Sequence, residues 1–150
     1  ENRLIEPGGI EIDGTPIDLG KIKVPCYFIS TIEDHIAPWK STYMGARRFG
    51  GPTRFVLGGS GHIAGIVNPP AANKYGYWLN PSAKLAETAD AWLEGAQQHP
   101  GSWWTDWQAW VTAHDSEQTE ARDPVNGKLE VLEDAPGSFV KIRIDAKAAA

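Results

Sequence analysis

An aspartate and a histidine each follow a run of residues that is typical of a buried strand. Asp34 follows the apolar and β-branched run at 24–30, and His62, 28 positions after Asp34, follows a similar run at 53–57. A carboxylate can hold an imidazole in one tautomer and stabilise its cation, and the imidazole can then take a proton from a nucleophile. Asp34 and His62 are therefore candidates for a catalytic acid and base.

The elements around this pair predict that its two members lie together. Residues 39–49 favour a helix that stops at Gly50 and Gly51, so strand, helix and strand form one βαβ unit. In a doubly wound α/β sheet, ligands bind beyond the C-terminal ends of the strands. Asp34 and His62 both lie just past such an end, and we expect them on the same rim of the sheet.

Each of the two residues also has a plainer interpretation. An aspartate that leaves a strand is often a turn or capping residue, and a single histidine in a glycine-rich loop is often structural. Their order after two successive strands favours the catalytic interpretation. Gly58, Gly59 and Gly61 are predicted to bend the backbone sharply enough to aim the His62 ring at the site.

The sequence contains no nucleophile in a suitable setting. In α/β-hydrolases the triad follows the chain order nucleophile, acid, histidine, with the nucleophile in a G-x-S-x-G type of elbow. Neither G-x-S-x-G nor G-x-C-x-G occurs here, so we expect the elbow to lie upstream of Glu1. Cys26 is a poor candidate because it falls inside a predicted strand, lacks flanking glycines and is expected to be a buried, inert thiol.

The other histidines carry weaker signals. His35 is a candidate for contacting substrate or stabilising charge, although an ordinary loop histidine is the plainer interpretation. His99 and His114 fall at predicted helix ends, where a cation suits the helix dipole, and they are assigned no chemistry.

Composition excludes several classes of function. The formal net charge of −5 and the scattered Lys and Arg argue against nucleic acid as the main partner, because phosphate binding needs a concentrated basic face. A single cysteine excludes an internal disulfide and a cysteine-based zinc site, and it weakly favours a reducing cytosol. No apolar run is long enough to span a membrane. The chain begins at Glu1 rather than Met and looks like part of a longer protein.

The chain is expected to divide into a catalytic part at 1–114 and a linker with a tail at 115–150. Glycine and proline punctuate residues 1–20, which predict a connecting segment with a short hairpin. A helix is expected at 82–98. The stretch at 128–145 fits either two short strands or an extended tail.

Tryptophan is concentrated in one part of the chain, with five of the seven between residues 92 and 110. A helix capped by Ser102 is expected at 103–114, and the spacing of Trp103, Trp107 and Trp110 places them on one face of it. We predict that this face docks on the sheet. The alternative is a surface that binds an acyl chain or a polymer.

Three motifs resemble the C-terminal end of the polyhydroxyalkanoate synthases, and the class I type, which acts on short-chain substrates, is the best match. They are EDHIAPWK at 33–40, GGSGHIAGIVNPP at 58–70 and QHPGSWWTDW at 98–107. The resemblance runs from about Asp18 to Trp110, with a weaker echo in the tail.

The resemblance implies an α/β fold that is the C-terminal part of an α/β-hydrolase, with the last strands of the sheet and the C-terminal helices. Carried over by motif, Asp34 and His62 are the acid and base of a Cys-His-Asp triad whose Cys lies upstream. In the implied reaction an (R)-3-hydroxyacyl group leaves CoA, is held on the Cys as a thioester, and is joined through its hydroxyl to a growing polyester. His62 generates the thiolate, and Asp34 either orients His62 or helps to deprotonate the incoming hydroxyl.

The resemblance also implies partners and a location. Members of the family work as homodimers at the surface of polyhydroxyalkanoate granules in the cytoplasm. They need no metal and no cofactor, since the CoA thioester is their substrate. The present chain alone is expected to be inactive because it lacks the nucleophile.

Two rival hypotheses stay open. The first is another α/β-hydrolase, such as an esterase, a lipase or a polyester depolymerase, which a serine rather than a cysteine at the elbow would favour. The second is a non-catalytic granule-binding or assembly module built on the tryptophan face, in which Asp34 and His62 would be dispensable.

Overall fold

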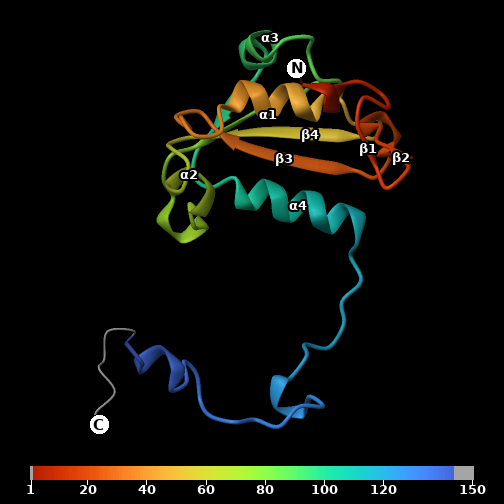
Figure 1. Ribbon diagram of the computed structural model, residues 1–150. Coiled ribbons are helices and arrows are strands. Elements are labelled where there is room, and N and C mark those ends of the chain that lie inside the picture. The colour runs from red at the N-terminus through yellow and green to blue at the C-terminus, as the bar shows by residue number, and fades with distance from the viewer. Residues whose placement is uncertain (1, 144–150) are drawn as a thin grey trace. The chain divides into compact units, whose positions relative to one another are not determined.

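A four-stranded sheet with the strand order β3-β4-β5-β6 organises the first part of the chain, and Figure 1 labels two of its strands, β3 and β4. The computed structural model describes residues 2–143. The chain divides into two units, Glu1–Ser116 and Glu117–Ala150. The sheet and the helices that pack on it all belong to the first unit.

The sheet is mixed. β3 (Cys26–Thr31) and β4 (Thr53–Gly58) are parallel and pair along all six residues of each strand. β5 (Tyr77–Leu79) pairs antiparallel with β4, and β6 (Gln97–His99) pairs antiparallel with β5. Both strands predicted from apolar runs are present, and the predicted α/β class is confirmed as a mixed α/β structure.

Helix α1 (Trp39–Ala46) joins the two parallel strands, which confirms the predicted βαβ unit. The helix ends three residues earlier than predicted. After Ala46 the chain tightens into a turn, in which the amide of Arg48 donates to the Gly45 carbonyl at 2.9 Å. This turn brings Phe49 edge-on against Phe28 of β3, with ring centroids 5.0 Å apart. Packing on the strand therefore replaces the last turn of the expected helix.

The predicted helix at 82–98 is wrong over most of its length. Helix α3 covers only Ala89–Glu94, and its Thr88 cap accepts a hydrogen bond from the amide of Ala91 at 3.1 Å. Gly95 ends the helix. The chain then forms β6, because β5 offers an edge with unpaired backbone groups that residues 97–99 can satisfy.

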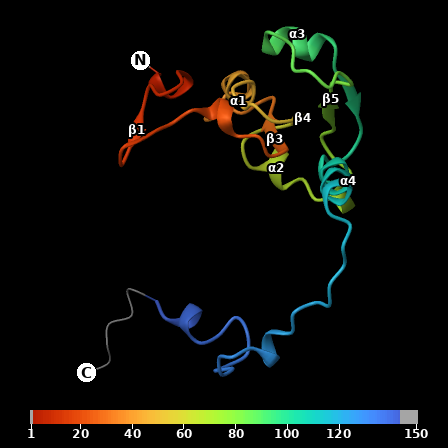
Figure 2. The same ribbon diagram turned by 90° about the vertical axis from the view of Figure 1, so that its right-hand side faces the viewer.

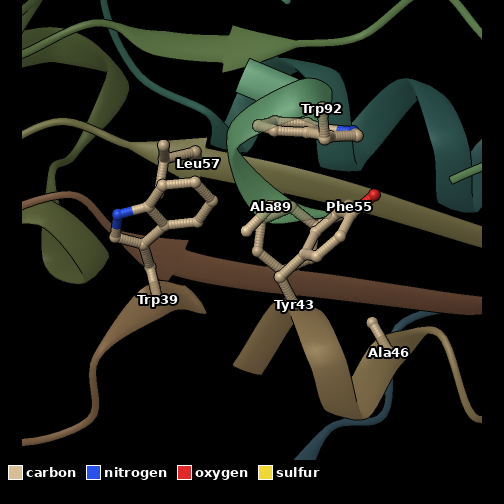
Figure 3. Packing of buried hydrophobic residues seen from close by; sticks show 7 residues of the cluster. All are labelled: Trp39, Tyr43, Ala46, Phe55, Leu57, Ala89 and Trp92. Carbon is tan, nitrogen blue, oxygen red and sulfur yellow. The ribbon is translucent and has the colours of Figure 1, made fainter. Parts of the chain in front are cut away.

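Alternation along the strands sends side chains to two separate apolar layers. On one face, Phe55 and Leu57 of β4 pack against α1 and α3 (Figure 3). The cluster drawn in Figure 3 comprises Trp39, Tyr43, Ala46, Phe55, Leu57, Ala89 and Trp92. On the other face, Val56 packs with Tyr77 and Trp103. Figure 2 shows α1 and α4 on opposite sides of β3 and β4.

Helix α4 (Trp104–His114) covers the second face, as predicted from its tryptophans. Tyr27 of β3 lies against Trp103 and Trp110, with centroid separations of 6.2 and 5.4 Å. The Tyr27 hydroxyl also donates to Asp106 at 2.9 Å. Burial, together with the nearby Asp106 carboxylate, raises the pKa of Tyr27 far above its usual range, so it stays a neutral donor.

Arg54 of β4 completes this contact through a two-pronged ion pair with Asp106. The Asp106 side chain is 11% exposed, and its carboxylate accepts hydrogen bonds from both strands. Fork-shaped pairing of a guanidinium with a carboxylate fixes orientation as well as distance. The helix is thus anchored to β3 and β4 near its N-terminal end.

The expected hairpin near the N-terminus is also present. β1 (Glu11–Ile12) pairs antiparallel with β2 (Thr15–Pro16). The two turn residues, Asp13 and Gly14, both have positive φ, as a tight hairpin turn requires. The short 3-10 helices of the first unit are η1 (Arg3–Ile5), η2 (Leu19–Lys21) and η3 (Pro70–Ala72).

Within its described residues, 117–143, the second unit holds two short 3-10 helices, η4 (Pro124–Asn126) and η5 (Phe139–Lys141). No strand occurs at 128–143, so of the two alternatives for the tail the strand pair is wrong over these residues, and residues 144 and 145 lie outside the described part of the chain. Across residues 2–143, no helix has both the length and the apolar character that a bilayer crossing requires.

Replacing Phe55 with alanine should destabilise the first unit strongly. Phe55 is 3% exposed and packs edge-on against Tyr43 and Trp92. Removing a buried aromatic side chain lowers the free energy of unfolding by about 3–5 kcal/mol. Phe139→Ala is the matched control because Phe139 is 82% exposed, and we expect a change of about 0.5 kcal/mol or less. Urea denaturation measures both variants, and equal losses would contradict the core position of Phe55.

Candidate active site

Two loops leave the sheet side by side at the C-terminal ends of β3 and β4. The ladder of backbone hydrogen bonds continues past both strand ends. The amide of Ile32 donates to the Gly58 carbonyl at 2.9 Å, and the amide of Glu33 donates to the Ser60 carbonyl at 3.1 Å. This continuation holds the loop that carries Asp34 against the loop that carries His62.

Asp34 and His62 meet across these loops. Oδ2 of Asp34 lies 2.8 Å from Nδ1 of His62. The other carboxylate oxygen, Oδ1, accepts hydrogen bonds from the amides of Ile36 and Ala37, both at 2.9 Å. The Asp34 side chain is only 7% exposed, whereas that of His62 is 45% exposed. The structure therefore brings the predicted pair together, with the carboxylate inside and the imidazole at the surface.

Hydrogen bonding decides the charge and the tautomer of the pair. The amide of Ala37, the His62 ring and the amide of Ile36 all donate to Asp34 and lower its pKa to about 2. An ionised carboxylate can only accept hydrogen bonds, so the proton of neutral His62 lies on Nδ1. Nε2 then carries the lone pair, and it has no partner among the described residues. This is the arrangement that a general base needs.

The backbone bend in the His62 loop is made differently from the prediction, which assigned it to glycines. Ser60, not a glycine, takes the left-handed conformation, with a φ of +67°. Gly59 is required for a different reason, since a Cβ there would lie 2.4 Å from the carbonyl oxygen of Tyr75. A Cβ on Gly61 would meet only the Glu33 carbonyl oxygen, at 3.9 Å. The loop therefore depends on close approach at Gly59 and on the turn at Ser60.

His35 is exposed in the same loop as Asp34, and within residues 2–143 it makes no hydrogen bond to either member of the pair. His35 lies at the rim of the site, and its contact with substrate stays a prediction.

Cys26 lies at the wrong end of the sheet to act with this pair. It is the first residue of β3, and five residues of strand span roughly 17 Å. The prediction of a fully buried thiol is wrong, because Cys26 is partly exposed and its Sγ donates to the Val24 carbonyl at 3.3 Å. Its place in the strand nevertheless keeps it away from His62.

The two remaining histidines take structural positions. His99 lies in β6 rather than at a helix end, and its ring stacks on Tyr77 at 5.3 Å. His114 ends α4 as predicted, with Nδ1 donating to the Trp110 carbonyl at 3.0 Å.

A cleft of about 420 Å³ between β4, β5 and β6 is lined by Arg54, Trp92 and His99 among others. It opens at the end of β4 opposite to the Asp34–His62 pair and takes no part in this site.

The chain was compared with known proteins. No family model matches it. It is 49% identical over 132 residues, 88% of its length, to "Poly(3-hydroxyalkanoate) polymerase subunit PhaC" of Rhizobium etli. The identity is 46% with the protein of the same name from Rhizobium meliloti and 42% with that from Cupriavidus necator, each over 95% of this chain. Over the matched residues, this chain is similar to poly(3-hydroxyalkanoate) polymerases.

The chain spans only part of each poly(3-hydroxyalkanoate) polymerase. It covers 20%, 23% and 24% of the length of these three relatives. The resemblance read from the motifs is confirmed, and the structure adds that two of those motifs meet through Asp34 and His62. Their catalytic roles in a polymerase stay a prediction.

The sequence analysis did not predict the residues that hold this pair in place. The amides of Ile36 and Ala37 hold Asp34 through the common turn in which an aspartate accepts from the backbone two and three residues on. An aspartate shortly before Pro38 is a recognisable sign of such a turn. The packing of Gly59 against Tyr75 had no such sign, because these residues approach through the tertiary fold.

The carboxyl group of Asp34 should titrate at about 2, below its ordinary pKa of 3.8. Because the pKa is lower in the folded state, the ionised form stabilises the fold above about pH 4, and this contribution is lost as the pH falls towards 2. Carbon NMR of the Asp34 carboxyl measures the midpoint. In His62→Ala the midpoint should rise but stay below 3.8, since two amide donors remain. A midpoint at or above 3.8 in the parent would contradict the hydrogen-bond pattern.

Proposed function

We propose that this chain supplies the acid–base pair of a polyhydroxyalkanoate polymerase, an acyltransferase that joins (R)-3-hydroxyacyl units from CoA thioesters into a polyester. The observation that carries the proposal is the 2.8 Å contact between Asp34 and His62, in a chain whose curated relatives are named poly(3-hydroxyalkanoate) polymerases. The pair needs a nucleophile, which we place in a cysteine elbow outside this sequence.

In the proposed first step, His62 Nε2 takes the proton of the cysteine thiol, and the thiolate attacks the carbonyl carbon of the acyl-CoA. The bond between that carbon and the CoA sulfur breaks, the acyl group stays on the cysteine as a thioester, and CoA leaves with the proton from His62. In the second step the hydroxyl of one unit loses its proton to His62 and attacks the thioester carbonyl carbon of the other, and the bond between that carbon and the cysteine sulfur breaks. The chain grows by one ester bond, and the proton returns to the cysteine.

The geometry favours an orienting role for Asp34. All hydrogen bonds described for its carboxylate are accepted ones, from the two amides and from His62, and the pKa of the carboxyl group is about 2. A carboxylate this weakly basic is poorly suited to remove a proton from a hydroxyl. We propose that Asp34 holds the tautomer of His62 and stabilises the imidazolium, and that His62 serves as the base in both steps.

The proposed fold for the complete catalytic domain is that of an α/β-hydrolase. The supporting observation is that acid and histidine follow two neighbouring parallel strands in chain order. A class I preference for short acyl chains, a homodimer and a place at cytoplasmic granules complete the proposal, and these rest on the resemblance of the motifs. The chemistry uses protein groups alone and calls for no cofactor beyond the substrate's own CoA.

The two rivals differ from this proposal in their products and in their use of His62. An esterase, lipase or depolymerase would transfer the acyl group to water and release a free hydroxy acid. A granule-binding module would need neither Asp34 nor His62. The burial of Trp103 against the sheet reduces the tryptophan surface available to such a module, although Trp104 is 38% exposed.

Replacing His62 with alanine in the full-length polymerase should lower kcat for CoA release from (R)-3-hydroxybutyryl-CoA by about 10²- to 10⁴-fold, because the general base is lost. Asp34→Asn should lower kcat within the same range, about 10²- to 10⁴-fold, because the proton of neutral His62 is then no longer held on Nδ1. CoA release and polymer yield are measured together. His114→Ala is the matched control, since His114 is exposed at the end of α4 and should leave both quantities unchanged.

Each alternative has its own outcome in this experiment. A fully active His62→Ala enzyme would contradict the acid–base assignment and favour the binding module. CoA release that yields free 3-hydroxybutyrate instead of polymer would favour a hydrolase.

His35→Ala should separate substrate contact from proton transfer. The side chain is exposed beside Asp34 and outside the hydrogen-bonded pair, so we expect KM to rise about 3- to 10-fold with kcat nearly unchanged. Steady-state kinetics on the full-length enzyme measure both constants. A loss of kcat as large as that of His62→Ala would place His35 in the proton transfer itself, and unchanged constants would leave it an ordinary loop residue.

A further inference from the structure

We infer that Trp103 and Trp104 are positioning residues for His62, which they hold in place through the short helix α2 (Ala64–Val67). The inference rests on the proposed role of His62 as the base. The two indole hydrogen bonds join segments that lie 37 and 38 residues apart in the sequence. The tryptophan pair therefore does more than cover the sheet.

Helix α2 cannot hold its own position. It has four residues and follows His62 after one intervening residue, Ile63. A helix this short does not form by itself in water, because one turn fixes several dihedral angles for very few hydrogen bonds. Its final carbonyl groups also lack partners within the helix. The orientation of the segment that begins at His62 must therefore come from outside α2.

The start of α4 provides these outside partners. The indole N–H groups of Trp103 and Trp104 both donate to the carbonyl oxygen of Ile66, at 3.1 and 3.2 Å. A carbonyl oxygen has two lone pairs, so the two donors can be accommodated together. The Ser102 hydroxyl donates to the carbonyl of Asn68 at 2.6 Å. Three consecutive residues, at the start of α4 and just before it, thus cap the C-terminal end of α2.

Gly65 of α2 is packed closely against Gly59 and the end of β3. A Cβ on Gly65 would lie 2.3 Å from the Gly59 carbonyl oxygen and 2.4 Å from Cγ2 of Thr31 at the end of β3. The amide of Gly65 donates to the Gly61 carbonyl at 3.0 Å, across His62. Close packing at Gly65 and the two indole donors at Ile66 both restrict the position of α2, and the His62 backbone is restricted with it.

The capping element is itself held firmly. Asp106, two residues after Trp104, is bound by Arg54 and Tyr27 of the two parallel strands. Trp103 is 7% exposed and packs on the same face of the sheet. The strands that carry Asp34 and His62 at their ends therefore also anchor the residues that orient α2.

The test uses the full-length polymerase with both indole donors removed, as W103F/W104F. Phenylalanine keeps an aromatic ring but lacks the N–H. Small displacements of a catalytic group can cost about 10²-fold in rate, so we expect kcat to fall by about 10- to 100-fold while KM changes by less than about twofold. Trp107→Phe is the matched control, because the Trp107 indole N–H has no hydrogen-bond partner within residues 2–143 while its ring packs on the same cluster.

A second readout reports on His62 directly. The rate at which iodoacetamide inactivates the enzyme follows the fraction of the nucleophile that is thiolate. In W103F/W104F a displaced His62 should move the pH profile of inactivation to higher pH, and in Trp107→Phe the profile should match the parent. A loss of stability alone would lower the amount of folded enzyme and leave this profile in place.

Several results would overturn the inference. Parental kcat and an unmoved profile in W103F/W104F, with His62→Ala inactive, would refute the positioning role and leave the proposed function intact. A fully active His62→Ala enzyme would refute both. If the double variant fails to fold, Trp104→Phe decides, because its ring is 38% exposed and the change is mild. A fall in kcat of about 2- to 5-fold with a shifted profile would then support the inference, and no change would refute it.

Discussion

The parallel pairing of β3 with β4 is the constraint on which the site depends. Parallel neighbours end at the same edge of a sheet, so the loops that follow them start side by side. Two further backbone hydrogen bonds, from Ile32 and Glu33, extend this pairing into the loops. A slip of one residue would turn the inward side chains of a strand to the other face, and the two apolar layers oppose such a slip. The 2.8 Å contact between Asp34 and His62 follows from this register.

The two charged or polar side chains of the site differ in exposure, with Asp34 inside and His62 at the surface. Asp34 is almost covered, and its described donors offset the cost of burying its charge. His62 is half exposed, with Nε2 turned away from that contact. An inner carboxylate of low pKa and an outer imidazole suit a base that must meet a group from another part of the enzyme. The structure and the proposed chemistry agree on this division of roles.

Much of the fold followed from local patterns. Apolar, β-branched runs predicted β3 and β4, the glycine pair after residue 49 predicted where α1 stops to within three residues, and the spacing of the tryptophans predicted how α4 docks. The failures share one cause. Residues 97–99 form a strand because β5 lies beside them, and Gly59 is needed because Tyr75 comes within reach of it. Neither partner is near in sequence, so no local propensity signals the contact.

By itself the sequence determined which residues could do the chemistry and in which order they come. It placed an aspartate and a histidine after successive strands, within motifs shared with the polymerases, because residue type and hydrophobic periodicity are local properties. Only the tertiary structure decided that Asp34 Oδ2 faces His62 Nδ1, and that the indole groups of Trp103 and Trp104 both donate to the Ile66 carbonyl at the end of α2. These contacts join segments that are distant in the chain, and their geometry depends on how the packed sheet and helices bring the backbones together.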